Sequence, residues 1–152
     1  AWSDIEGGYE AAIARMISDG NTIYVINFSV GGSRSASNTV SYDNWGERIE
    51  AAGGFWATSA GNSGSDACNF APAFTSYAIS VGAYNRQGVP STWFTNFGPC
   101  VDTWGPGESV YSTYPGDGYG TSSGTSMSSP NVASIMINAL KEDSTRTLSQ
   151  IK

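Results

Sequence analysis

The sequence contains no histidine, and this absence restricts the proton chemistry open to the chain. Histidine is the side chain most often used for proton transfer near neutral pH. Charged residues are also scarce, at 13%, and only seven of them are basic against thirteen acidic ones, which gives a net charge of −6. Nucleic-acid binding needs clustered positive charge, so the composition argues against a nucleic-acid partner.

Long hydrophobic runs are absent as well. No apolar stretch approaches the roughly 18 to 20 residues that a membrane-spanning helix requires, so we expect no membrane association. Residues 1–4 have neither the basic nor the apolar part of a signal peptide. Because the chain opens without Met and directly in a predicted helix, we expect it to be an internal portion of a larger protein. The 19 glycines and many Ser, Thr and Asn residues are typical of secreted proteins rich in tight turns.

Only two cysteines are present, Cys68 and Cys100, and both lie in polar, turn-rich segments. They do not form a metal-binding cluster with other cysteines. A disulfide is the leading interpretation, and a pair of unrelated buried thiols is the alternative.

What is present is an alternation of helix and strand patterns. Apolar residues at spacings of three and four indicate helices, and short β-branched or apolar runs that end in glycine indicate strands. The second helix is predicted to begin after Ser41 as its cap. This order predicts one doubly wound, mainly parallel α/β sheet flanked by helices, with ligands bound at the carboxyl ends of the strands. The predicted helices cover residues 3–18, 41–52 and 132–140, and the predicted strands cover residues 23–30, 55–59, 77–84, 101–104 and 109–114.

The segment Gly124–Pro130, Gly-Thr-Ser-Met-Ser-Ser-Pro, places Ser126 just before the last helix. Pro130 is predicted to lie in the first turn of that helix, where its missing N–H would have no partner. A helix N-terminus stabilises negative charge, so this position favours a reactive hydroxyl. An ordinary serine N-cap is the alternative.

The whole of this segment resembles the nucleophile motif of the subtilase family, Gly-Thr-Ser-Met-Ala-Ser/Thr-Pro-His-Val-Ala-Gly. Other segments resemble elements of the family, and of its proteinase K-like branch, in the family's order. The resemblance implies a subtilisin-like fold that is incomplete at both ends, with residues 1–152 forming the C-terminal portion of one catalytic domain. The matching segments are residues 25–32, 60–64, 69–73, 79–83, 95–98 and 104–107.

The resemblance also implies a serine endopeptidase that acts on peptides or proteins. Ser126 corresponds to the nucleophile, and Asn62 to the side-chain donor to the oxyanion, together with the backbone N–H of Ser126. Without the resemblance, Asn62 reads as an ordinary turn residue. Two segments correspond to the walls of the primary specificity pocket, which bind an extended substrate by strand addition; these are Ser29, Val30 and Gly31 on one side and Ser59, Ala60 and Gly61 on the other.

A structural calcium ion is a further implication, because Asp102 matches a position where proteinase K-like enzymes bind calcium. The remaining ligands are expected to be the backbone carbonyls of Ser76 and Ala78, since calcium prefers oxygen ligands. A solvated or turn-capping Asp102 is the alternative. The chemistry itself requires no cofactor. The resemblance also favours the disulfide between Cys68 and Cys100, and a secreted or extracellular protein.

The chain departs from the family in its catalytic base. Subtilases use an Asp, His and Ser in that order, and neither the Asp-Thr/Ser-Gly nor the His-Gly-Thr segment is found here. Lys141 lies too far along the last helix to replace the histidine. Either the Asp and His reside on an upstream segment or partner, or the chain is a catalytically inactive structural or binding module. The changes to Asn131 and Ser134 within the motif favour the second interpretation, since Ser134 is expected to crowd helix against sheet. The retention of both Ser126 and Asn62 favours the first, the protease, which is the preferred interpretation.

Sedolisins are a third, less favoured resemblance. They use Ser with Glu and Asp, but their oxyanion donor is an Asp where this chain has Asn62.

Overall fold

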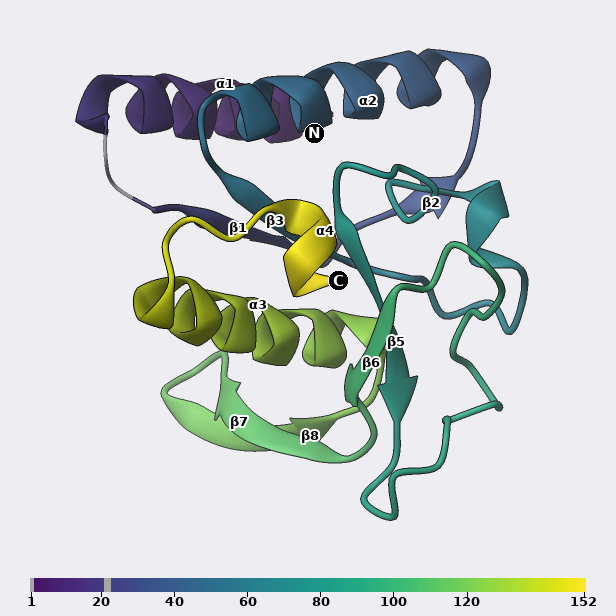
Figure 1. The fold of residues 1–152 in the computed structure, drawn as a ribbon. Coiled ribbons are helices and arrows are strands. Elements are labelled where there is room, and N and C mark those ends of the chain that lie inside the picture. Colours follow the sequence, from purple (N-terminus) through teal and green to yellow (C-terminus); the bar gives the residue numbers. More distant parts are fainter. Residues whose placement is uncertain (1, 21–22) are drawn as a thin grey trace.

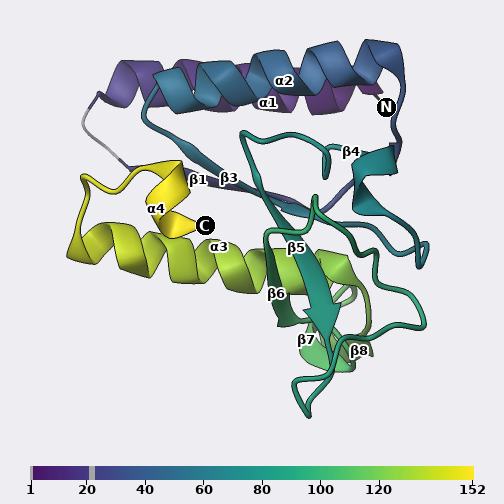
Figure 2. The same cartoon turned by 45° about the vertical axis from the view of Figure 1, so that its right-hand side comes forward.

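A computed structural model describes residues 2–20 and 23–152 of the chain. Its centre is a parallel four-stranded sheet with the strand order β1-β3-β5-β6. Two helices cover one face of the sheet and a third, with a short fourth helix beside it, covers the other (Figures 1 and 2). The predicted α/β sheet flanked by helices is therefore confirmed. The strands are β1 (Val25–Phe28), β3 (Phe55–Ser59), β5 (Ile79–Tyr84) and β6 (Thr103–Pro106), and the helices are α1 (Trp2–Asp19), α2 (Ala36–Ala51), α3 (Thr125–Glu142) and α4 (Leu148–Ile151).

Two small antiparallel pairs complete the structure. β2 (Gly32–Ser33) pairs with β4 (Phe70–Ala71), which follows the 3-10 turn η1 (Ala67–Asn69). β7 (Val110–Tyr114) and β8 (Gly118–Ser122) form a hairpin that leads directly into α3. In Figure 1 this hairpin lies on the outer side of α3, away from α1 and α2.

The two faces of the sheet carry separate cores because neighbouring strand residues point in opposite directions. Trp56 is fully buried toward α1 and α2, where Tyr9 stacks on Trp45 with ring centroids 4.5 Å apart. Ala57, the next residue, is fully buried among residues of α3 and β5 such as Val81. Burial on both faces explains why the central strands read as nearly continuous apolar runs.

The second helix begins earlier than predicted. Ser35, and not Ser41, is its cap: the Ser35 side chain accepts the Asn38 N–H at 3.3 Å, and the Asn38 side chain accepts the Ser35 N–H at 2.8 Å. Such a reciprocal pair satisfies two amide groups at the helix start. The first turn escaped the sequence pattern because its residues are polar apart from Ala36, which is exposed, so the turn has no buried apolar residue. Ser41 instead lies within the helix and donates to the carbonyl of Ser37.

Candidate active site

The carboxyl ends of β1 and β3 meet at one edge of the sheet, because the two strands are parallel and Phe28 pairs with Thr58. The segments that follow β1 and β3 lie next to each other beyond the ends of these strands, and the first turn of α3 lies beside both of them. A cavity of about 500 Å³ lies between them. All eight residues predicted for the nucleophile, the oxyanion donor and the pocket walls line it, namely Ser126, Asn62, residues 29–31 and residues 59–61.

The last long helix starts at Thr125, capped by Gly124, so Ser126 is its second residue. The prediction was therefore wrong in two respects: Ser126 lies inside the first turn of the helix instead of just before it, and Pro130 lies in the second turn instead of the first. The N–H groups of a first helical turn have no carbonyl within the helix to bind, and they carry a partial positive charge. The Ser126 N–H is one of these groups.

Pro130 has a different structural consequence from the one predicted. A residue at this position would normally donate its N–H to the carbonyl four residues earlier, which is that of Ser126. Proline has no N–H, and the Ser126 carbonyl instead accepts a hydrogen bond from the Ser29 hydroxyl at 3.1 Å. In return the Ser126 hydroxyl donates to the Ser29 carbonyl at 3.0 Å. These two bonds join the end of β1 to the start of α3 across the cavity.

The side chain of Asn62 is oriented by Thr125. Its Oδ1 accepts hydrogen bonds from the backbone N–H and from the Oγ1 hydroxyl of Thr125, each at 2.8 Å. Because a backbone amide can only donate, the oxygen of the carboxamide must face α3. The Nδ2 group, for which the described residues provide no hydrogen-bond partner, is left as a donor on an exposed residue that lines the cavity.

Gly61 gives the turn before Asn62 its shape. Its φ is +103°, a conformation that other L-residues rarely adopt, and a Cβ there would lie 2.3 Å from Nδ2 of Asn96. The sequence analysis assigned Gly61 to a pocket wall and did not identify this backbone requirement.

Two fully buried polar residues that sequence reasoning did not single out hold this region together. Thr125 Oγ1 accepts the Gly61 N–H at 3.1 Å in addition to its bond to Asn62. Asn96 accepts the N–H groups of Ser63 and Ser65 and donates to the Ala60 carbonyl at 2.8 Å. Both lie within segments that matched the family motifs, and that match was the available signal. Their partners lie more than 30 residues away in the sequence.

The residues that line the cavity carry no charge. None of the residues that line it is ionisable, so no group in its wall can take a proton from Ser126 near neutral pH. Lys141 lies on the last turn of α3, about 22 Å from Ser126 along the helix axis at 1.5 Å per residue. The prediction that Lys141 cannot act as the base agrees with this position.

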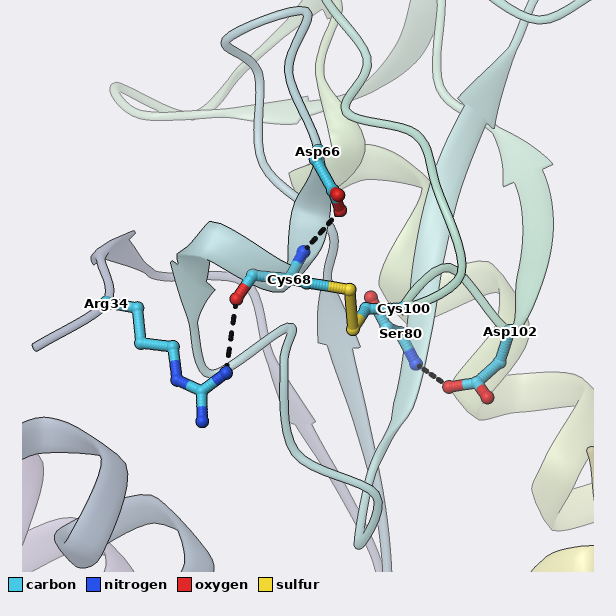
Figure 3. The surroundings of a disulfide bond; sticks show 6 residues. All are labelled: Arg34, Asp66, Cys68, Ser80, Cys100 and Asp102. Atoms are coloured by element: carbon cyan, nitrogen blue, oxygen red, sulfur yellow. Dashed lines mark hydrogen bonds between the residues drawn. A yellow bond between two sulfur atoms is a disulfide. The ribbon is translucent and has the colours of Figure 1, made fainter. Parts of the chain in front are cut away.

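Cys68 and Cys100 form a disulfide, as predicted, with their Cα atoms 5.2 Å apart. Figure 3 shows the bond between η1 and the loop before β6, with the Cys68 N–H donated to Asp66 and the Cys68 carbonyl facing Arg34. The disulfide therefore braces the chain that continues from Asn62 against the loop that contains Asn96.

The residues expected to bind calcium lie at the amino ends of the parallel strands, just before β5 and β6, and so at the opposite end of the sheet from the cavity. One carboxylate oxygen of Asp102 accepts the Ser80 N–H at 2.8 Å (Figure 3). The other lies 3.1 Å from the ammonium of Lys152, which also donates to the Ser76 carbonyl at 3.0 Å. Two of the three expected ligands thus contact Lys152, and calcium binding stays a prediction.

The model of the subtilase family matches residues 3–152. The chain is a subtilase. A cold-adapted subtilisin-like serine proteinase of known structure superposes on this subtilase with a TM-score of 0.76 at 30% identity, over 93% of this chain and 50% of that protein. A protease from Pseudoalteromonas arctica also has a TM-score of 0.76, at 29% identity, over 84% of this chain and 41% of its own. These superpositions confirm the predicted subtilisin-like fold.

Curated relatives agree on the family. Alkaline serine exoprotease A of Vibrio alginolyticus is 37% identical over 84% of this chain and 23% of its own length. Subtilisin-like serine protease pepC of Aspergillus niger is 40% identical over 74% of this chain and 20% of its own length. The subtilase chain therefore spans about a fifth to a quarter of these relatives. None of its helices, as far as the described residues extend, is long and apolar enough to cross a membrane.

Proposed function

We propose that this chain supplies the nucleophile, the oxyanion hole and the specificity-pocket walls of a serine endopeptidase. The observation that carries the proposal is the meeting of Ser126, Asn62 and both wall segments around one cavity at the carboxyl edge of the sheet. Ser126 Oγ attacks the carbonyl carbon of the scissile peptide bond, and its proton passes to a general base. The leaving amine takes that proton, and water then hydrolyses the acyl-enzyme.

The oxyanion is proposed to lie between Asn62 Nδ2 and the backbone N–H of Ser126. Thr125 supports this role because it holds the carboxamide oxygen of Asn62 away from the cavity. The donor is therefore oriented before a substrate arrives, which is what makes such donors effective. In subtilisin, a relative, loss of one oxyanion donor costs about 2.7 to 4 kcal/mol of transition-state stabilisation. That value sets the scale that we expect for Asn62.

The general base must come from outside the chain, which has no histidine. The Ser126 hydroxyl donates to the neutral carbonyl of Ser29, and a base must draw it away from that bond before it can attack. We propose that a catalytic Asp and His reside on the remainder of the subtilase domain, upstream or on a complementing chain.

A feature of β1 supports this partner. β1 lies at the edge of the four-stranded sheet, beside an apolar groove of about 180 Å³ lined by Tyr9, Ile26 and Phe28, among others. An unpaired strand edge next to an apolar groove favours the addition of another strand. Relatives several times longer than this chain have the sequence to provide one.

Substrate is proposed to bind as an extended peptide between residues 29–31 and residues 59–61. Strand addition supplies backbone hydrogen bonds, and the neutral lining of the cavity favours an uncharged side chain in the pocket. The disulfide and the family suggest a secreted or extracellular enzyme, since such bonds persist in oxidising surroundings.

Labelling with a fluorophosphonate tests the proposal in the whole protein. We expect covalent modification of Ser126, its loss in Ser126→Ala, and a drop in peptide hydrolysis on the order of 10⁶-fold in that variant. Ser123→Ala is the matched control, because Ser123 is exposed, close in sequence and outside the cavity. Failure of the whole protein to react with the probe would contradict the proposal.

A catalytically inactive subtilase-like module is the alternative, favoured by the lack of histidine within the chain. The expected crowding at Ser134 does not support it, because that side chain is exposed on α3 and does not separate helix from sheet. Asn131, also exposed, donates to the Met127 carbonyl within the same helix. Inertness toward the probe with an intact fold would favour this alternative.

A further inference from the structure

The ammonium of Lys152 lies between two oxygens that come from distant parts of the chain. It is 3.1 Å from Asp102 Oδ1 and donates to the Ser76 carbonyl at 3.0 Å. The second carboxylate oxygen is held by the Ser80 N–H at 2.8 Å (Figure 3). The side chains of Lys152 and Asp102 are only 23% and 22% exposed, so this pair is less screened than an ordinary surface ion pair.

Packing of the preceding segment brings Lys152 to this place. Leu148 and Ile151 of α4 pack against the core between α3 and the sheet. The turn that starts α4 is fixed by Thr147, whose N–H bonds to the Gln150 side chain at 2.8 Å. The position of the ammonium therefore follows from burial of its neighbours as well as from the attraction of Asp102.

A calcium ion needs six to eight oxygen ligands at about 2.3 to 2.6 Å. Here one carboxylate is present, one of its oxygens already accepts an amide N–H, and the other two expected contacts are backbone carbonyls. No group of three acidic, histidine or cysteine side chains is found within residues 2–20 and 23–152. A single carboxylate balances the charge of one ammonium, whereas a divalent ion would leave excess positive charge.

The two cations also compete for the same atoms. Calcium at this place would need the Asp102 and Ser76 oxygens that Lys152 already contacts, and the two positive charges would repel each other. We propose that the ammonium of Lys152 is the resident cation of this site and that calcium binds there only when Lys152 is displaced.

Calcium titration by calorimetry of the whole protein, stripped beforehand with a chelator, tests this competition. We expect Lys152→Met to bind calcium at least about tenfold more tightly than the wild type, because the competing charge is gone. Lys152→Arg, which keeps the charge, is expected to behave like the wild type. Asp102→Asn is the control that measures calcium binding at any other site. Combined with Lys152→Met, it should abolish the tighter calcium binding of that variant.

Thermal unfolding gives a readout independent of activity. Calcium is expected to raise the melting temperature of Lys152→Met and to leave that of the wild type unchanged at the same concentration. Equal calcium affinity of wild type and Lys152→Met at an Asp102-dependent site overturns the proposal, and so does a folded Lys152→Met variant that binds no calcium. If Lys152→Met fails to fold, tight Asp102-dependent calcium binding by the wild type still overturns it.

Discussion

Replacing Thr125 with valine tests whether its buried hydroxyl organises the site. Valine keeps the volume but removes the bonds to Asn62 Oδ1 and from the Gly61 N–H. Asn62 Oδ1 keeps its second donor, so the first loss costs about 1 kcal/mol, whereas the stranded Gly61 N–H costs about 1 to 2 kcal/mol. We expect Thr125→Val to lower the free energy of unfolding by about 2 to 3 kcal/mol, measured by urea denaturation.

Thr125→Ser is the matched control, because it keeps the hydroxyl and removes one buried methyl group at a cost of about 1 kcal/mol. The valine variant should therefore be the less stable of the two. In the whole enzyme its kcat should also fall more than that of the serine variant, with KM little changed, since Asn62 loses part of its support. The fall should stay below the roughly 10² to 10³-fold that accompanies loss of an oxyanion donor. A valine variant at least as stable as the serine variant refutes the reasoning.

Three further predictions concern stability. Replacing Cys68 and Cys100 together with serine should lower the free energy of unfolding by about 4 kcal/mol, in the chain-entropy model for a sequence separation of 32. A change in the denaturation midpoint that corresponds to less than about 1 kcal/mol contradicts this prediction. Tyr9→Phe should leave the free energy of unfolding unchanged or raise it by about 1 kcal/mol, because the Tyr9 hydroxyl is buried and has no hydrogen-bond partner among residues 2–20 and 23–152. Hydrogen bonds from Arg48 lower the pKa of Glu10, so the stabilisation from this pair is present above the ordinary pKa of glutamate and disappears as the pH falls through the lowered value. The stability gap between wild type and Glu10→Gln should accordingly be largest near neutral pH and close in acid, and a gap that is constant with pH argues against it.

Local pattern was enough to predict the order of helices and strands and most of their positions. The strand at residues 55–59 was predicted with its observed bounds, because burial on both faces produces a continuous apolar run that glycines end. The start of α2 was missed, because its first turn, capped by Ser35, buries no apolar residue and therefore carries no hydrophobic period. The ordered motifs identified the family before any contact was known. The matched segments included every residue later found around the cavity except Ser33 and Ser59, each of which directly adjoins a matched segment.

The sequence by itself therefore determined the family, the layered α/β architecture and the residue types available for chemistry, including the lack of histidine. Only the tertiary structure decided what these residues contact. The Ser126 hydroxyl bonds to a carbonyl 97 positions away, Thr125 orients Asn62 from 63 positions away, and Lys152 meets Ser76 from 76 positions away. Helix and strand patterns arise from neighbours along the chain, whereas these pairings depend on how the packed elements bring remote polar groups together, and no local period records that.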